Sequence, residues 1–193
     1  TLIIVSGSYN QLGKDEVKKI KKWVEEGNTL ITVAGGSSWA ISKKLINESL
    51  VESKKDSTHS RKNYVDASEF IGRERIGGVI LKADIDLTHP IAFGYNDNSI
   101  PVYKNNNVFI NKTKNDYSSV ATYSKDFHID GYISESNKKD FIPGAASLII
   151  SKVGSGRVVV FADNPNFRGT WYGTNKLFLN AIFLGNNISI PTN

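Results

Sequence analysis

The sequence of 193 residues contains no cysteine. This absence excludes disulfide bonds, thiolate zinc sites, iron–sulfur clusters and a cysteine nucleophile within the chain. Methionine is missing as well, so we expect the chain to be a processed product or a piece of a longer polypeptide. Histidine is scarce, and none of the three has a partner at the spacing of metal ligands, so no metal site is predicted.

Long apolar runs and a strong excess of one charge are also missing. No run reaches the roughly 18 to 20 apolar residues that cross a membrane, and no signal peptide opens the chain. Lys and Arg outnumber Asp and Glu by 24 to 19, but the basic side chains between residues 14 and 26 are mixed with acidic ones. Because nucleic-acid binding needs concentrated positive charge, we predict neither a nucleic-acid partner nor a membrane span.

Two continuous apolar runs, residues 2–5 and 30–34, are typical of strands that are buried on both faces of a parallel sheet. Between them, apolar side chains recur at the three- and four-residue spacing of a helix. A pair of glycines follows the second run, and Ser37 or Ser38 would cap a short helix that runs through Ile46. This order of strand, helix, strand, turn and helix predicts an α/β fold with a parallel sheet.

The rest of the chain extends this sheet as a single domain over residues 1–193. Residues 47–76 are highly charged and predict an insertion that leaves the sheet, after which residues 78–83 return as a strand. Residues 145–162 contain two apolar runs around a glycine turn, which indicates a hairpin rather than a phosphate-binding loop. The segment 174–184 is apolar nearly all round and predicts a final helix that is largely buried.

Ser37 is a candidate nucleophile. A strand that runs into a tight glycine turn and then into a helix is how a nucleophile elbow presents its side chain. A serine nucleophile also needs a base, and the sequence offers only His89, with Asp84 or Asp86 to orient it. The alternative is that Ser37 caps the helix and that the ring of His89, held extended by Pro90, fixes a turn.

The loop from Asp163 to Gly173 holds the densest group of polar and aromatic side chains in the sequence. Loops at the carboxyl ends of parallel strands share one edge of the sheet, where ligands of α/β proteins bind. Aromatic rings beside arginine and amides suit sugars, peptides or a protein partner, and the alternative is that the aromatic residues close the end of the sheet. The side chains expected to converge there are Tyr9, Asn10, Ser37, Trp39, Asn166, Arg168, Trp171 and Tyr172.

Four segments, residues 6–10, 22–27, 86–95 and 161–180, resemble the C-terminal region of large bacterial zinc carboxypeptidase-like proteins. Members of that group carry a carboxypeptidase A-type catalytic domain followed by a class I glutamine amidotransferase-like domain. The resemblance implies a flavodoxin-like, mostly parallel sheet with helices on both faces, to which the residues themselves add an antiparallel excursion and a terminal hairpin. It also implies a secreted or periplasmic location.

The resemblance further implies an accessory role rather than catalysis by this chain. The zinc ligands of the peptidase have no match here, so zinc would belong to the catalytic domain of the same polypeptide, which would be the partner. The catalytic cysteine of an amidotransferase would stand near Gly36 and Ser37, where there is none. We therefore expect a non-catalytic domain that packs on the catalytic domain or positions its substrate. The alternatives are a small serine hydrolase using Ser37 and His89, or a module that binds peptide or carbohydrate.

Overall fold

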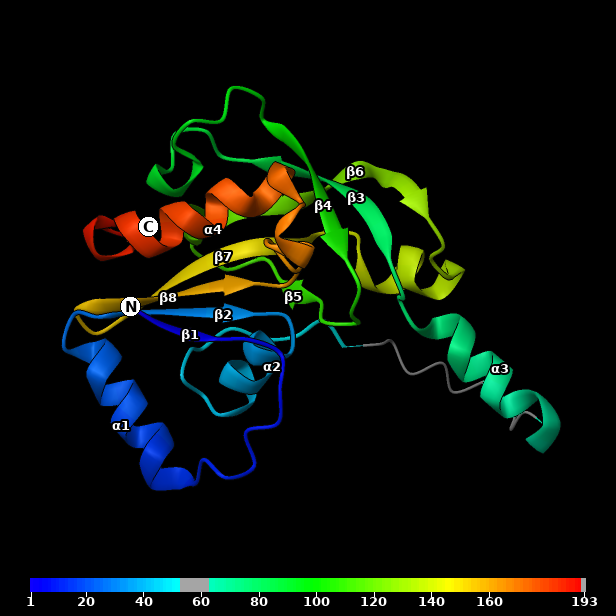
Figure 1. Ribbon diagram of the computed structural model, residues 1–193, viewed down its shortest axis with the longest axis horizontal. Helices are drawn as coiled ribbons and strands as arrows, with labels where there is room; N and C mark the ends of the chain where they lie inside the picture. The colour runs from blue at the N-terminus through cyan, green and yellow to red at the C-terminus, as the bar shows by residue number, and fades with distance from the viewer. Residues whose placement is uncertain (53–62, 192–193) are drawn as a thin grey trace.

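The computed structural model describes residues 1–52 and 63–191, so part of the charged segment 47–76 lies outside the described residues. Strands and helices follow one another as a mixed α/β chain (Figure 1). The strands are β1 (Leu2–Ile4), β2 (Thr29–Val33), β3 (Val79–Ile85), β4 (Ser99–Lys104), β5 (Ile110–Asn111), β6 (Ser119–Gly131), β7 (Ala145–Val153) and β8 (Gly156–Phe161). The helices are α1 (Lys14–Glu25), α2 (Gly35–Ser42), α3 (Tyr64–Glu74) and α4 (Tyr172–Leu184), with short helical turns η1 (Pro90–Ala92), η2 (Asp116–Ser118), η3 (Asn137–Phe141), η4 (Phe167–Gly169) and η5 (Gly185–Asn187).

One sheet runs through the molecule in the order β1-β2-β8-β7-β6-β3-β4, and β5 pairs with β7 beside this path. β1, β2 and β8 are parallel, with Ile3 beside Ile31 and Ile31 beside Val159. The prediction that residues 2–5 and 30–34 form neighbouring parallel strands is confirmed. The predicted hairpin is confirmed as well, since β7 and β8 pair antiparallel across a short glycine turn.

The remaining pairings are antiparallel, and this part of the sheet is larger than the excursion that the sequence indicated. β6 alone spans 13 residues and pairs with both β3 and β7. Beyond Ser124 its side chains are largely exposed and polar, so the apolar pattern of the sequence does not indicate the full length of the strand. The sheet is therefore mixed rather than mostly parallel, while the α/β class with helices on both faces is confirmed.

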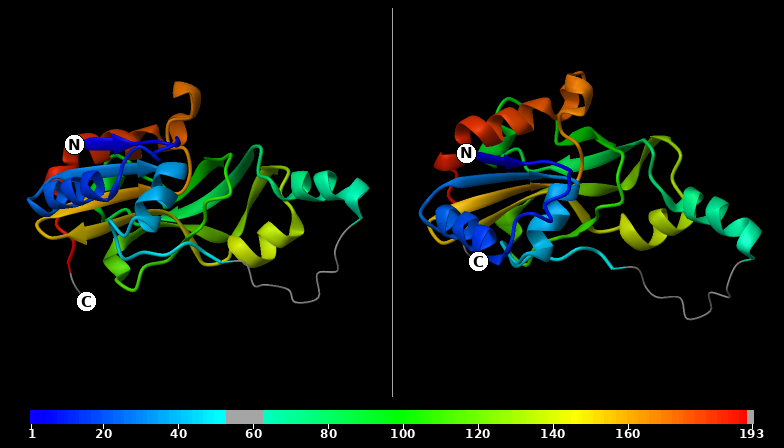
Figure 2. Two further views of the ribbon diagram at one scale, coloured as in Figure 1. Left: turned by 90° about the horizontal axis from the view of Figure 1, so that it is seen from below. Right: turned by 60° about the horizontal axis from the view of Figure 1, so that its bottom comes forward.

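Helices cover both faces of the parallel strands (Figure 2). On β2, Leu30 packs with α1 and α2 in one buried core, whereas Ile31 packs with α4 in the other. Because alternate residues of a strand point to opposite faces, a continuous apolar run fills both cores. Within residues 1–52 and 63–191, no helix combines the length and the apolar character needed to cross a membrane.

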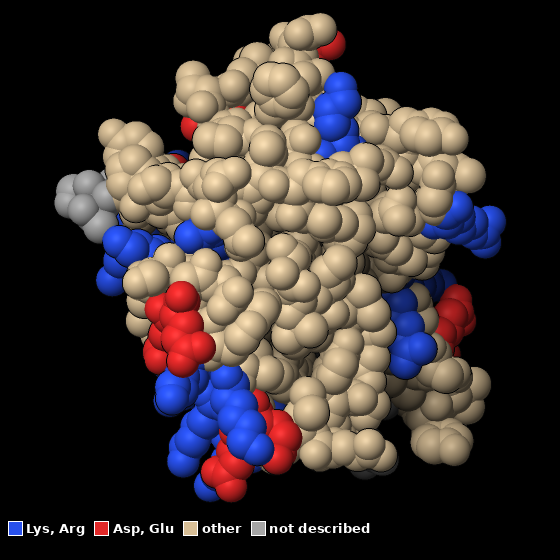
Figure 3. Space-filling model, turned by 60° about the vertical axis from the view of Figure 1, so that its left-hand side comes forward, with Lys and Arg blue, Asp and Glu red and all other residues tan. Residues whose placement is uncertain are grey.

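Two predictions of burial are wrong. α4 buries Leu177 against β2 and β8 but leaves Leu179 and Phe183 44% and 75% exposed. On the edge strand β1, Leu2 and Ile3 are each 39% exposed, and Val5, which follows the strand, is 52% exposed. Figure 3, which views the left-hand side of Figure 1, shows charged side chains clustered at the bottom, where Figure 1 places α1, and others along both edges and near the top.

α3 extends away from the rest of the molecule (Figures 1 and 2). It buries no side chain, and Tyr64 and Val65 at its start are 92% and 85% exposed. Its last residue, Glu74, is held by hydrogen bonds that the hydroxyls of Ser134 and Ser136 donate to its carboxylate. The helix is therefore fixed to the sheet at its carboxyl end.

Candidate functional site

The turn between β2 and α2 has the backbone of a nucleophile elbow. Ala34, the single residue between strand and helix, has φ 50° and ψ −113°. A non-glycine residue adopts this conformation only in a strained turn. In enzymes with an elbow, such a turn presents the nucleophile at the carboxyl edge of the sheet. The residue here is alanine, so the backbone has the conformation of an elbow but the side chain offers no nucleophile.

Gly36 shows how closely the elbow is packed. A Cβ atom at this position would lie 2.3 Å from the carbonyl oxygen of Ile4 and 2.7 Å from that of Val5. The first turn of α2 therefore rests directly on the end of β1, and only glycine fits. The N–H of Gly35 donates a hydrogen bond to the hydroxyl of Ser6 at 3.0 Å, which fixes the same junction.

Ser37 is not the elbow residue. α2 begins at Gly35, so Ser37 lies inside the helix, and neither it nor Ser38 caps the helix as predicted. The side chain of Ser37 is fully buried; its hydroxyl donates a hydrogen bond to the carbonyl oxygen of Phe161 at 2.8 Å and lies 3.0 Å from Oγ1 of Thr32. This hydroxyl joins α2 to β2 and β8 and is not presented to a substrate.

His89 lies on the other face of the sheet. Its Nδ1 accepts a hydrogen bond from the N–H of Ile91 at 3.2 Å, which confirms that the ring fixes a turn. Burial lowers the pKa of the ring, and the charge of Asp86 opposes this shift. Ile91 packs in the core beneath α4, whereas Thr32, the partner of Ser37, faces α2. The sheet therefore separates Ser37 from His89, and the structure does not bring this pair together.

Tyr9 and Trp39 form a small aromatic cluster beside the elbow. Their ring centroids are 5.2 Å apart, and both rings pack against the core beneath α1 and α2. The hydroxyl of Tyr9 donates to the carbonyl oxygen of Val5 at 2.5 Å. The indole N–H of Trp39 is buried and has no hydrogen-bond partner in the described part of the chain. Asn10 is exposed and borders a shallow hollow along the start of α1.

The loop after β8 builds a second aromatic cluster, on the side of β4. Phe167 stacks on Tyr103 with ring centroids 3.9 Å apart, and Trp171 lies 5.8 Å from the same ring. The indole N–H of Trp171 donates to the carbonyl oxygen of Pro101 at 3.2 Å. All three rings are half-buried. We call Tyr103, Phe167 and Trp171, together with Arg168, the aromatic platform.

Arg168 is the exposed cation of the aromatic platform. Its backbone is left-handed, with φ 52°, and its guanidinium carbon lies 5.1 Å from the centre of the Phe167 ring. Its side chain is exposed, and no ion pair to it is present among the described residues. A guanidinium in this position is able to pair with a carboxylate or to stack on a ring that a ligand brings.

The expected convergence of all the predicted binding residues is therefore only partial. Tyr9 and Trp39 pack on the α2 side of the sheet, whereas Arg168 and Trp171 lie on the β4 side. Asn166 is exposed, and its side-chain oxygen accepts a hydrogen bond from Asn175 at 3.0 Å. Tyr172, the first residue of α4, is 78% exposed. The loop and the elbow share the carboxyl edge of the parallel strands but present two separate clusters.

A buried polar cluster anchors the aromatic platform. The carboxylate of Asp163, where the loop begins, accepts hydrogen bonds from Lys104 at 3.1 Å, from Tyr123 at 2.8 Å and from Ser147 at 2.5 Å. Burial lowers the pKa of Lys104 against the opposing charge of Asp163, and burial together with that charge raises the pKa of Tyr123 well above its usual value. Because Lys104 directly follows Tyr103, this cluster ties the loop to β4.

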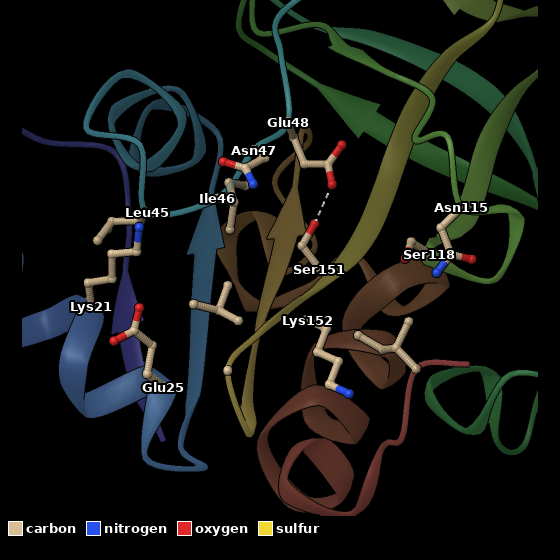
Figure 4. Close-up of a pocket in the computed structure, with 13 residues that line it drawn as sticks. Lys21, Glu25, Leu45, Ile46, Asn47, Glu48, Asn115, Ser118, Ser151 and Lys152 are labelled. Atoms are coloured by element: carbon tan, nitrogen blue, oxygen red, sulfur yellow. Dashed lines mark hydrogen bonds between the residues drawn. The ribbon is translucent and has the colours of Figure 1, made fainter. Parts of the chain in front are cut away.

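A separate hollow of about 390 Å³ lies at the opposite edge of the sheet, near the amino end of β8 (Figure 4). Glu48 lines the hollow and accepts a hydrogen bond from the hydroxyl of Ser151 at 2.7 Å. Lys21 and Glu25 of α1 line one wall, and Lys152 of β7 lines another. The hollow was not predicted from the sequence, because its residues come from five segments that are distant along the chain. Over the described residues, no group of three acidic or histidine side chains could hold a metal ion.

Comparison with known proteins supports the fold. No family model matches the sequence, and no curated protein does. PurLQS from Thermotoga maritima superposes with a TM-score of 0.51 at 14% identity, over 93% of this chain and 78% of that one. The chain has a class I glutamine amidotransferase-like fold. A GMP synthase-like protein from Thermoplasma acidophilum has a TM-score of 0.48 at 16% identity, over 96% of this chain and 72% of that one. A cytoplasmic protein from Salmonella typhimurium has a TM-score of 0.48 at 15% identity, over 98% and 71%.

The resemblance to amidotransferases placed the nucleophile in the turn near Gly36 and Ser37. The strained backbone of this turn lies at Ala34, two residues before Gly36. The signal in the sequence is weak, because alanine at the end of an apolar run reads as one more strand residue. Tyr103 and Lys104 were also missed, since only the pairing of β4 with the sheet brings them to the loop.

Proposed function

We propose that this chain is a non-catalytic accessory domain of a larger polypeptide, which packs on a catalytic domain or positions its substrate. The observation that carries the proposal is Ala34 at the elbow, where a methyl group replaces any nucleophile. The serine hydrolase alternative has less support, because Ser37 is buried in the sheet and His89 caps a turn on the opposite face.

The catalytic domain in this proposal is a zinc carboxypeptidase-type metallopeptidase of an exported bacterial protein. Support for this part comes from the sequence motifs in residues 86–95 and 161–180. Zinc would be bound by the catalytic domain, and no role is assigned to it in this chain. A secreted or periplasmic location is part of the same proposal.

The aromatic platform is the surface through which this domain would meet a peptide, a carbohydrate or the catalytic domain. Three half-buried rings provide an apolar surface, and Arg168 adds an exposed charge that a carboxylate would pair with. Packing alone would require the rings but not the arginine. The exposure of Arg168 therefore favours a binding role over simple closure of the sheet.

The first test compares the parent polypeptide with and without residues 1–193. We expect removal to change the KM or the rate of the peptidase, while this chain alone hydrolyses neither glutamine nor a nitrophenyl ester. Hydrolysis by the chain that Ser37→Ala abolishes would contradict the proposal. Unchanged kinetics and unchanged stability of the shortened parent would contradict it as well.

The second test measures binding of the isolated catalytic region to this chain. We expect Arg168→Ala and Trp171→Ala each to weaken binding by about 2 kcal/mol, near thirtyfold, as loss of an interface hot spot does. Tyr117→Ala is the matched control, because Tyr117 is an aromatic residue 53% exposed at the opposite edge of the sheet. Equal binding by all three variants would leave the loop with only a structural role.

A further inference from the structure

The hollow near the amino end of β8 combines an apolar floor with charged walls. Its volume of about 390 Å³ lies within the range of small-molecule pockets, about 300 to 1,000 Å³. The floor includes Leu45, Ile46 and Ile190, each of which is buried. Charged side chains line the walls, two of each sign: Lys21, Glu25, Glu48 and Lys152. Because the elbow and the aromatic platform lie at the carboxyl edge of the parallel strands, the hollow is separate from both.

The four charged side chains of the hollow do not neutralise one another. Among residues 1–52 and 63–191, none of them forms an ion pair. Glu48 and Lys21 are held by neutral partners, a serine hydroxyl and a carbonyl oxygen at 3.4 Å. The side chains of Glu25 and Lys152 have neither a hydrogen bond nor an ion pair in the same part of the chain. Groups of both signs are therefore available to a ligand.

These charges come to the hollow from three different elements (Figure 4). Lys21 and Glu25 project from α1 on one side, and Lys152 lies on the other side, near the end of β7. Glu48, on the segment after α2, points into the space between them, and its hydrogen bond from Ser151 fixes this orientation. A ligand in the hollow can therefore meet a carboxylate and an ammonium group at once.

This pattern of charge selects among classes of ligand. A simple anion would be attracted by the two lysines but repelled by Glu25 and Glu48, and a simple cation would meet the reverse. A neutral sugar would need free amides and hydroxyls. The amide of Asn115 is already engaged, since it donates to the carbonyl oxygen of Pro191 at 2.7 Å and accepts from the N–H of Tyr117 at 3.0 Å. A ligand that carries both an ammonium and a carboxylate satisfies both kinds of wall.

We propose that the hollow binds a small zwitterion with an apolar side chain, which is an amino acid or a short peptide. Its carboxylate would pair with Lys152, and its ammonium group with Glu48. Its side chain would contact the floor at Leu45 and Ile46. Charge-assisted hydrogen bonds fix the orientation of such a ligand, and contact with the floor adds burial of apolar surface. This site goes beyond the accessory role proposed above and does not depend on it.

An NMR titration of the whole chain tests the chemistry of the ligand, with leucine as the probe. We expect leucine to shift the amide signals of residues 45–48 and 151–154. Leucinamide lacks the carboxylate and 4-methylpentanoate lacks the ammonium group, so each should bind about tenfold more weakly. Leucyl-leucine distinguishes the two sources of this chemistry, because the form that binds more tightly, amino acid or peptide, is the ligand. Failure of both leucine and leucyl-leucine to bind at about 10 mM, or equal binding by either analogue, would overturn the proposal.

Substitutions in the hollow test which residue meets which end of the ligand. Lys152→Met should weaken the binding of leucine about tenfold but leave that of leucinamide unchanged, because leucinamide has no carboxylate to lose its partner. Glu48→Gln should weaken the binding of leucine and leave that of 4-methylpentanoate unchanged. Lys125→Met, at an exposed position on β6, is the matched control and should bind leucine as the wild type does.

The analogues also separate a lost contact from a lost fold. A variant that no longer folds would lose both ligands, whereas a lost contact affects only the ligand that makes it. Wild-type affinity for leucine in both Lys152→Met and Glu48→Gln, or equal weakening of leucine and leucinamide by Lys152→Met, would overturn the proposal. The accessory role is unaffected by either result, since it rests on Ala34.

Discussion

Lys104 and Asp163 form an ion pair of 3.1 Å in which the lysine side chain is 0% exposed and the aspartate side chain 5%. Lys104 is the last residue of β4, and Asp163 lies at the start of the loop after β8. The pair therefore joins the antiparallel part of the sheet to the candidate site. Removing one partner from such a pair leaves a buried charge without its counterion.

We therefore expect Lys104→Met to lower the free energy of unfolding by about 3 kcal/mol. The double variant Lys104→Met with Asp163→Asn should lose less than the sum of the two single losses, because the residues are in contact. Urea denaturation of the four proteins measures this coupling. Strictly additive losses would show that the pair is not formed in solution.

The titration of His89 should make the free energy of unfolding depend on pH. Burial lowers the pKa of its ring below the usual 6.5, so below that pH the unfolded chain binds a proton that the folded chain does not. The free energy of unfolding should therefore fall as the pH drops through this range. His89→Asn keeps a cap at η1 without a titrating group, so it should lose less stability between pH 7.5 and pH 5.5. Parallel losses in urea midpoints for both proteins would contradict this assignment.

Two glycine substitutions should act in opposite directions. Gly36→Ala places a Cβ 2.3 Å from the carbonyl oxygen of Ile4, so the elbow must shift, and we expect a loss of about 3 kcal/mol. Gly72→Ala lies in α3, where the added Cβ would have no atom within 4 Å among the described residues apart from its chain neighbours and the backbone of its own helix, and it should gain about 0.5 to 1 kcal/mol if the unfolding of α3 is measured. Thermal unfolding followed by circular dichroism distinguishes the two, and a tolerated Gly36→Ala would mean that α2 does not rest on β1 as described.

Trp171 and Arg168 should differ in what they contribute to folding. Trp171→Phe keeps a ring beside Tyr103 but loses the hydrogen bond to Pro101, which we expect to cost about 1 kcal/mol. Arg168→Ala removes an exposed side chain and should change stability by less than about 0.5 kcal/mol. Guanidinium denaturation measures both, and a large loss for Arg168→Ala would indicate a structural role.

The strands at the centre of the sheet were predictable because burial on both faces demands continuous apolar runs. Residues 30–34 show this, since Leu30 and Ile31 fill different cores. The turn at His89 was also predictable, because the proline that follows restricts its backbone. These features depend on neighbours within a few residues.

The features that were missed depend on contacts between distant parts of the chain. Nothing local to Lys104 distinguishes it from a surface lysine, and its burial results from β4 lying against the loop 59 positions later. The elbow at Ala34 likewise cannot be recognised from the residues around it, because its φ is imposed by the junction of β1, β2 and α2. The burial of α4 was overestimated because an apolar sequence does not say how much of the helix surface the rest of the fold covers.

α3 extends away from the rest of the molecule and divides the described chain into two parts. β1, β2 and both helices on their outer face precede α3, and β3 to β8 with α4 follow it. The two groups are joined through the parallel pairing of β2 with β8, where five residue pairs lie side by side, and through the shared cores. A protease that severs the backbone within α3 would leave two fragments held together as one particle. The protein is thus suited to being produced as two separate polypeptides that reassemble along β2 and β8.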